Sequence, residues 1–197
     1  MTQNIIGFIG PFGAGKTTIA HAVQARINTR PKICTVNHFA DPIKFGLASM
    51  GIHKSSTPPL YRKTAQFVGA AARSYDPDFW VEQFDLFMQK TSLNYPWVLV
   101  DDVRYFNEID YIKDRGGHIV FVDASSDISL DDPARDHESE AVANALHAEH
   151  SERYHANPSI SRAHSIFLNQ DIWVARNIRG KADELATRLL GRILSAD

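Results

Sequence analysis

The sequence has little of several features that mark particular classes of protein. It contains one cysteine, Cys34, so no disulfide can form within the chain and a reducing compartment is expected. No stretch approaches the roughly 18 consecutive apolar residues of a membrane-spanning helix. The N-terminus lacks the basic start and long apolar run of a secretory signal. We therefore expect a cytoplasmic protein that has no membrane partner.

The chain also lacks an excess of charge of either sign. Its 21 basic and 23 acidic residues give a net charge of -2, whereas nucleic-acid binders usually carry a basic excess. We therefore expect no nucleic-acid polymer as a partner, although a local basic pocket for phosphate is compatible with this balance. Hydrophobic residues make up 44% of the chain and charged residues 22%, close to the globular average. The length of 197 residues predicts one large domain or a core with one insertion.

Short apolar runs alternate with helical patterns along most of the chain. The strand candidates are short runs of strand-forming residues at 4–9, 32–36, 97–100, 118–122 and 172–175. The helix candidates show apolar residues at helical spacing or a helix boundary signal, at 16–28, 42–50, 61–73, from 77 onward, 108–115 and 181–194. This alternation predicts an α/β fold in which a central parallel sheet has helices on both faces.

One segment, 124–162, breaks the alternation. It is polar, rich in Asp, His and Arg, and contains one short helix candidate at 138–150. We interpret it as a lid-like insertion. Residues 1–123 and 163–197 then form the core.

A glycine-rich loop follows the first strand candidate. Residues 10–17 fit the pattern G-x-x-x-x-G-K-[ST], and an amphipathic helix follows them. Glycines let successive backbone N–H groups curl around phosphates, and the helix start adds a favourable potential for an anion. Lys16 is expected to reach the β- and γ-phosphates of ATP, and Thr17 to offer its hydroxyl to Mg²⁺. The motif predicts a P-loop NTPase-type three-layer fold, with nucleotide contacts at Gly13, Ala14, Gly15, Lys16, Thr17 and Thr18.

Two aspartates, Asp101 and Asp102, follow the buried strand candidate at 97–100. In P-loop proteins a carboxylate at such a strand end holds Mg²⁺, so both are candidates for the metal site together with Thr17. The sequence leaves open which of the two binds the metal, and two exposed turn aspartates are the alternative. No glutamate follows them directly, which favours transfer to a bound acceptor over hydrolysis that drives motion.

Several short segments of the chain together form a pattern. Residues 102–108 read Asp-Val-Arg-Tyr-Phe-Asn-Glu and are followed by the glycine pair 116–117. Three further segments lie at 39–44, 76–80 and 136–140. In their order these segments resemble the motifs of the deoxynucleoside monophosphate kinase family of bacteriophages, in which the first reads Asp-Val-Arg-Phe-Pro-Asn-Glu and is followed by Gly-Gly. The resemblance covers most of the chain, from Ile5 to about Leu189.

The resemblance implies ATP-dependent phosphorylation of a deoxynucleoside monophosphate to the diphosphate, with Mg²⁺ as cofactor. ATP and the monophosphate are the expected partners, and a homodimer is left open. The compartment is the host cytoplasm if the protein is phage-encoded. Tyr105 and Phe106 replace the family's Phe-Pro pair, and Glu138 replaces a proline. Because these departures alter loops near the site, base preference is not transferred from the family.

The expected site combines metal-binding and phosphate-binding residues. Both substrates are polyanions, and the planar fork of arginine bonds two phosphate oxygens at once. Arg104 lies two positions beyond Asp102 and is expected to bind the acceptor or the transferring phosphate. The catalytic residues are expected to be Lys16, Asp102 and Arg104. Acceptor-binding residues are expected in helices at about 39–93 and in the segment after the aspartates: Asp41, Lys44, Arg73, Trp80, Arg104 and Glu108.

Three of these assignments have structural alternatives. A monophosphate is already a nucleophile near neutral pH, so Asp41 is expected to orient the sugar or the metal shell, or else to cap the helix before Pro42. Trp80 is expected to stack on or border the acceptor base, or else to lie in the core. The expected lid residues are Arg135, His137, Arg153 and Arg162. The arginines would close over the transferring phosphate, or else remain surface charges.

Other functions remain open on the sequence alone. One is another small P-loop kinase, acting on a ribonucleotide or on a coenzyme hydroxyl, for which Asp41 would serve as general base. A different class is a P-loop ATPase motor or a nucleotide-gated binding protein. A motor needs a partner arginine and a ring or a DNA track, and the small size and near-neutral charge disfavour it.

Overall fold

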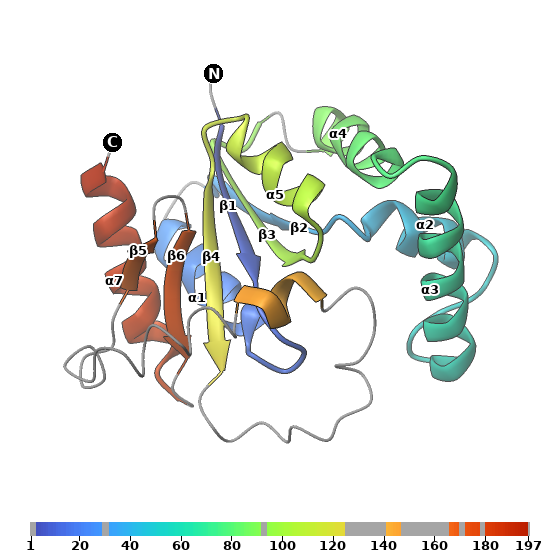
Figure 1. Cartoon of the computed structure of the whole chain (residues 1–197), viewed down its shortest axis with the longest axis horizontal. Helices are drawn as coiled ribbons and strands as arrows, with labels where there is room; N and C mark the ends of the chain where they lie inside the picture. The colour runs from blue at the N-terminus through green and yellow to red at the C-terminus, as the bar shows by residue number, and fades with distance from the viewer. Residues whose placement is uncertain are drawn as a thin grey trace.

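The computed structural model describes residues 3–28, 32–91, 94–124, 141–146, 166–169, 172–177 and 180–196. These residues form an α/β structure of three layers, in which helices cover both faces of a central sheet (Figure 1). The α/β fold and the alternation of strands and helices expected from the sequence are confirmed.

The sheet has six strands in the order β2-β3-β1-β4-β6-β5. Five of them run parallel, and β5 pairs antiparallel with β6 at one edge. The sequence did not predict β5, because this edge strand gains its conformation from pairing with β6. The bounds are β1 (Asn4–Ile9), β2 (Cys34–Asn37), β3 (Trp97–Val103), β4 (His118–Ala124), β5 (Ile166–Asn169) and β6 (Ile172–Asn177).

The long helices begin and end close to their predicted positions. Their bounds are α1 (Lys16–Ile27), α2 (Asp41–Ser49), α3 (Pro58–Tyr75), α4 (Phe79–Thr91), α5 (Phe106–Lys113) and α7 (Ala182–Ala196). Residues 141–146 add a short helix. Proline stands in the first turn of α2 and of α3, where its missing N–H has no intrahelical partner to lose. Gly116, with φ of 70°, ends the turn after α5.

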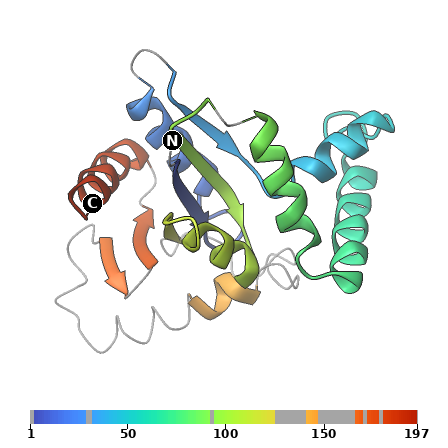
Figure 2. The same ribbon diagram turned by 90° about the horizontal axis from the view of Figure 1, so that it is seen from above.

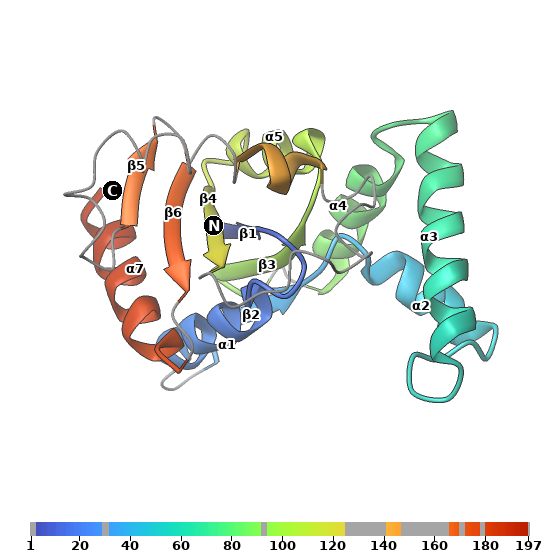
Figure 3. The ribbon, with the colours of Figure 1, turned by 60° about the horizontal axis from the view of Figure 1, so that its bottom comes forward.

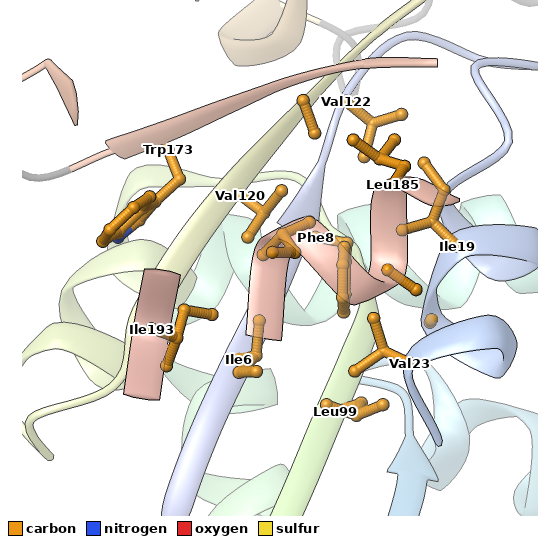
Figure 4. Close-up of a cluster of buried hydrophobic side chains, with 14 of the residues drawn as sticks. Ile6, Phe8, Ile19, Val23, Leu99, Val120, Val122, Trp173, Leu185 and Ile193 are labelled. Carbon is orange, nitrogen blue, oxygen red and sulfur yellow. The ribbon is translucent and has the colours of Figure 1, made fainter. Parts of the chain in front are cut away.

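Two helical layers sandwich the sheet. In Figures 2 and 3, α1 and α7 cover one face, while α5 and α4 lie on the other. Side chains of β1 alternate accordingly, with Ile6 and Phe8 toward α1 and α7, and Ile5 and Ile9 toward α4 and α5. Figure 4 shows the first of these clusters, whose sheet residues meet Ile19 and Val23 of α1 and Leu185 and Ile193 of α7.

The helices α2 and α3 extend beyond the β2 edge of the sheet (Figures 1 and 3). They are joined to α4 by a third apolar cluster built on Ile43, Leu47 and Trp80. This arrangement places α2 and α3 beside the carboxyl ends of β2 and β3. In open α/β sheets, ligands bind just outside the carboxyl ends of the strands.

Candidate functional site

The loop between β1 and α1 has the backbone shape that its glycines predict. Gly13 and Gly15 have φ values of 80° and 86°, in the left-handed region that favours glycine. A side chain at Gly10 would place its Cβ 2.4 Å from the carbonyl oxygen of Val122, so the close approach of β4 also requires glycine there. These glycines let the loop turn sharply from the buried strand β1 into the start of α1, which is the shape of a phosphate-binding loop.

Lys16 and the first turn of α1 provide positive potential at this loop. The Lys16 ammonium donates to the carbonyl oxygens of Gly10 at 2.6 Å and Pro11 at 3.0 Å. Thr17 and Thr18 follow in the first turn and are exposed. Because this turn carries no carboxylate of its own, the positive end of the helix dipole is available to an anion.

The strand β3 is longer than predicted and contains both aspartates. The pairing of β3 with β1 shifts register between Val100 and Val103, and both of these valines pack in the cluster on the α4 and α5 side. The alternation of the strand is therefore interrupted at the two aspartates, and their contacts distinguish them instead. Asp101 meets Thr17 of α1 and His38, whereas Asp102 bonds the main chain of Phe39 and Ala40.

Asp101 joins the phosphate loop to the segment that follows β2. Its side chain is only 1% exposed, accepts a hydrogen bond from the Thr17 side chain, and has Oδ1 3.0 Å from His38 Nε2. Burial opposes ionisation of this carboxylate. The close approach of the His38 ring and the bond from Thr17 outweigh that effect and hold the pKa of Asp101 below its usual range. Asp101 is therefore an anionic oxygen donor beside the phosphate-loop threonine.

Asp102 has a different environment from its neighbour. Its two carboxylate oxygens accept main-chain hydrogen bonds from Phe39 at 2.7 Å and Ala40 at 3.1 Å. Burial raises the pKa of Asp102, although these bonds and the nearby cations oppose the shift. The geometry thus places Asp102 as an anchor of the loop between β2 and α2. The catalytic and metal-binding roles expected for Asp102 from the sequence stay predictions, and these contacts give it a structural role as well.

The segment between β2 and α2 carries a polar cluster around Asp41. His38 Nδ1 lies 3.0 Å from Asp41 Oδ1, and the Lys44 ammonium donates to the same oxygen at 2.8 Å. Burial favours the neutral form of Asp41, but these two bonds outweigh it and lower its pKa. Burial alone would also lower the pKa of His38, whereas its contacts with Asp101 and Asp41 raise it to about 10. The sequence analysis did not single out His38.

Arg104 and Glu108 lie at the turn from β3 into α5. Glu108 is 2% exposed, and its carboxylate accepts hydrogen bonds from the main-chain N–H groups of Arg104 at 2.6 Å and Tyr105 at 3.1 Å. Glu108 thus caps the start of α5 by bonding main-chain N–H groups that precede its own turn. The Arg73 guanidinium lies over the Tyr105 ring, 4.0 Å from its centroid. Arg73 and Arg104 are therefore brought to one turn, while Glu108 shapes that turn in place of the acceptor contact expected from the sequence.

Glu108 predicts a measurable pH dependence of stability. Burial, with a further contribution from Asp102, raises its pKa from 4.5 to about 8. Between these values the native protein keeps a proton that the unfolded chain has lost, so this group makes the free energy of unfolding fall as pH rises. We expect the stability of Glu108→Gln relative to wild type to increase from pH 5 to pH 8 in chemical denaturation. Glu82→Gln, on the exposed face of α4, serves as control. Parallel pH profiles for wild type and Glu108→Gln would contradict the prediction.

Trp80 lies in the core and not at an acceptor base. Trp80 is 7% exposed and packs with Ile43 and Leu47 in the cluster between α2, α3 and α4. The indole N–H donates to the carbonyl oxygen of Gly69 at 3.0 Å, which ties α4 to α3. The base-stacking role is therefore corrected in favour of the core alternative. Large aromatics at helical spacing do not by themselves distinguish these two roles.

We expect Trp80→Phe to reduce stability and to leave substrate affinity unchanged. Phenylalanine keeps an aromatic ring but leaves the Gly69 carbonyl without its donor, which costs about 1–3 kcal/mol for a buried polar group. Denaturant unfolding and the acceptor KM measure the two effects. Phe67→Leu, an exposed aromatic of α3, is the control. Unchanged stability with a raised acceptor KM would restore the base-stacking role.

The remaining site predictions fall into two groups. Asp41, Lys44, Arg73 and Arg104 come from elements that meet at the carboxyl ends of β2 and β3. The proposed lid at 124–162 lies outside the described residues except for Ala124 and the helix 141–146. The lid residues Arg135, His137, Arg153 and Arg162 all fall in the part that is not described.

Comparison with known proteins gives one relative in sequence and several in structure. A protein of Acanthamoeba polyphaga mimivirus named "Putative deoxynucleotide monophosphate kinase" is 30% identical over 146 residues, which cover 60% of this chain and 73% of the viral protein. No family model matches the chain. Across the helices of the described ranges, none is both long and apolar enough to cross a membrane.

Solved structures with similar folds include shikimate kinases. The enzyme from Acinetobacter baumannii, in complex with shikimate, gives a TM-score of 0.52 at 19% identity over 100% of this chain and 96% of that one. The enzyme from Aquifex aeolicus gives 0.50 at 14% identity, over 98% and 97%. At these identities the similarity shows a common fold, which is that of P-loop kinases.

Proposed function

Because this chain belongs to the family of deoxynucleotide monophosphate kinases, we propose that it transfers the γ-phosphoryl group of ATP to a deoxynucleoside monophosphate, which becomes the diphosphate. One observation carries the proposal. Three features lie together at the carboxyl ends of neighbouring strands: the phosphate loop after β1, the carboxylate of Asp101 on β3, and cationic side chains beside the ends of β2 and β3. A donor nucleotide and a second phosphate-bearing substrate can therefore be bound side by side.

The donor side of the site comprises the loop and the start of α1. Main-chain N–H groups at Gly13, Ala14 and Gly15 would surround the ATP phosphates, with Thr17 and Thr18 in the first helical turn. Lys16 already lies at the loop through its bonds to two loop carbonyls. With ATP bound, its ammonium is proposed to bond the β- and γ-phosphates and to stabilise charge that develops on the transferring group.

The oxygen donors beside this loop fit Mg²⁺. In the described ranges, no group of three or more His, Cys, Asp or Glu side chains could hold a metal ion. Mg²⁺ in kinases is commonly held by one or two carboxylates together with substrate phosphates, so a full protein cage is not required. Thr17 and Asp101, which contact each other, would hold it. When bound, Mg²⁺ supplies charge neutralisation at the β- and γ-phosphates.

The acceptor side is proposed to comprise Asp41, Lys44, Arg73 and Arg104. The cations neutralise and orient the acceptor phosphate, whose oxygen attacks the γ-phosphorus of ATP in line with the departing ADP. A phosphate oxygen is nucleophilic near neutral pH, so no strong base is needed. Asp41 suits such a reaction, because its contacts with His38 and Lys44 lower its pKa and make it a weak base.

Arg104→Met tests the placement of the acceptor. Methionine keeps much of the stem volume and removes the phosphate-binding fork. We expect near-normal ATP binding and a loss of roughly 10²-fold in kcat/KM for the monophosphate, the scale of one lost transition-state contact. Arg188→Met, which removes an arginine ion-paired with Glu184 on the surface of α7, is the control. If ATP affinity falls while the monophosphate KM is unchanged, Arg104 faces the donor and the proposed map is reversed.

A panel of acceptors tests the proposed function itself. ADP release from ATP and Mg²⁺ is measured with deoxyribonucleoside monophosphates, ribonucleoside monophosphates, small hydroxyl compounds and DNA. We expect turnover that depends on a deoxyribonucleoside monophosphate. Preference for a hydroxyl compound, with Asp41→Asn nearly inactive, would indicate a hydroxyl kinase. Turnover stimulated only by DNA would indicate a motor.

A further inference from the structure

A continuous path of polar contacts links the donor side of the site to the acceptor side. The Thr17 side chain bonds Asp101, and Asp101 Oδ1 lies 3.0 Å from His38 Nε2. On its other side, His38 Nδ1 lies 3.0 Å and 3.1 Å from the two carboxylate oxygens of Asp41. Lys44 extends the path along α2 through its 2.8 Å bond to Asp41. One imidazole ring thus connects a carboxylate of β3 to a carboxylate of α2.

The backbone around His38 fixes the direction of this ring. The main-chain N–H of His38 donates to Asp41 Oδ2 at 2.8 Å, and the N–H of Asp41 donates to the His38 carbonyl at 3.0 Å. These two bonds hold His38 and Asp41 in one local turn, from which the imidazole ring extends to Asp101. Because each ring nitrogen contacts a different element, the length of the imidazole sets the separation of Asp101 and Asp41.

Anchoring of this loop does not depend on His38 alone. Asp102 already holds the main chain of Phe39 and Ala40. The His38 side chain, by contrast, is 31% exposed and lies between the two halves of the site. A second anchor at this position adds little to loop closure, but it defines where Asp41 lies relative to the phosphate loop.

We propose that His38 is a positioning residue that holds Asp41 and the acceptor-binding start of α2 at a fixed separation from Asp101 and the donor phosphates. This inference rests on the proposed function. In-line transfer requires the acceptor oxygen to lie close to the γ-phosphorus and in line with the leaving group, and a misplacement of about 1 Å can reduce the rate 10²-fold. His38 acts through Asp41 and Asp101, without itself touching the reacting atoms.

Three substitutions at this position test the bridge. In His38→Asn the side-chain amide reaches about as far as Nδ1, so it keeps the Asp41 contact and loses Asp101. In His38→Gln the amide reaches about as far as Nε2, so it keeps the Asp101 contact and loses Asp41. His38→Leu removes both. His53→Gln, an exposed histidine in the loop before α3, is the matched control.

Each variant is measured for kcat and KM with the preferred deoxynucleoside monophosphate, for ATP affinity by calorimetry without acceptor, and for thermal unfolding. We expect kcat to fall about tenfold or more in His38→Asn and His38→Gln, and about 10²-fold in His38→Leu. ATP affinity should stay within about threefold of wild type in all of them.

Three outcomes would overturn the inference. Wild-type kcat in either His38→Asn or His38→Gln would show that one contact is enough and that no bridge is needed. A lowered unfolding temperature with unchanged kcat, or an equal loss of ATP affinity and kcat, would show a structural role. Absence of acceptor-dependent turnover in the wild-type protein would instead contradict the proposed function, and the inference would fall with it.

Discussion

Replacing Lys16 with alanine is expected to remove phosphoryl transfer and to leave the fold intact. The Lys16 ammonium donates to the loop carbonyls of Gly10 and Pro11, and the residue is partly exposed. With ATP bound it would neutralise charge on the transferring phosphate, which no neighbouring side chain of the loop can replace. We expect kcat to fall about 10³-fold or more, the upper range for loss of one preorganised charge contact.

The control for this experiment is Lys90→Ala, which removes an exposed lysine near the end of α4. Circular dichroism and thermal unfolding establish that both variants are folded, and coupled ADP release measures their turnover. A folded Lys16→Ala protein that keeps more than a tenth of wild-type kcat would contradict the assignment of the phosphate loop.

The adjacent aspartates provide the second large effect, because one is expected to matter for chemistry and the other for folding. Asp101 lies beside Thr17 on the α1 face, so Asp101→Asn removes the anionic oxygen proposed for Mg²⁺. We expect a loss of about 10³-fold in kcat and a shift of the Mg²⁺ dependence to higher concentration. In Asp102→Asn, the side-chain NH₂ group would instead face the main-chain N–H of Phe39 or Ala40, so that two donors meet and one hydrogen bond is lost. We expect it to reduce stability by about 1–3 kcal/mol with a much smaller effect on kcat.

The two variants are matched in chemistry and differ by one position in the chain. Titration of turnover with Mg²⁺, combined with denaturant unfolding of each variant, separates their roles. A pattern in which Asp102→Asn changes the Mg²⁺ dependence and Asp101→Asn does not would reverse the assignment made from the contacts of the two aspartates.

The parts of the fold that were predictable from the sequence are those with local signals. The phosphate loop combines glycines at positions of positive φ with a strand before it and a helix after it, and all three signals are local. Gly116 likewise marked the end of α5. The edge strand β5 was missed, because its four residues gain their strand conformation from pairing with β6.

The site was less predictable where its geometry depends on contacts between distant segments. The two-residue period of a strand could not assign Asp101 and Asp102, because β3 shifts register against β1 at this point. The role of His38 depends on Asp101, which lies 63 positions away in the sequence, and nothing in the local pattern around His38 indicates it. Trp80 shows the converse, since an aromatic in a motif-like segment proved to belong to the core.

Phosphorus NMR of the products shows whether the acceptor is itself a phosphate. ATP, Mg²⁺ and a deoxynucleoside monophosphate are incubated with the protein, and the phosphorus resonances are followed to completion. We expect loss of the ATP γ-resonance with equal amounts of ADP and a deoxynucleoside diphosphate, whose new phosphorus is in a phosphoanhydride. A new phosphate monoester formed on a hydroxyl, or inorganic phosphate as the only product, would rule out a phosphate acceptor.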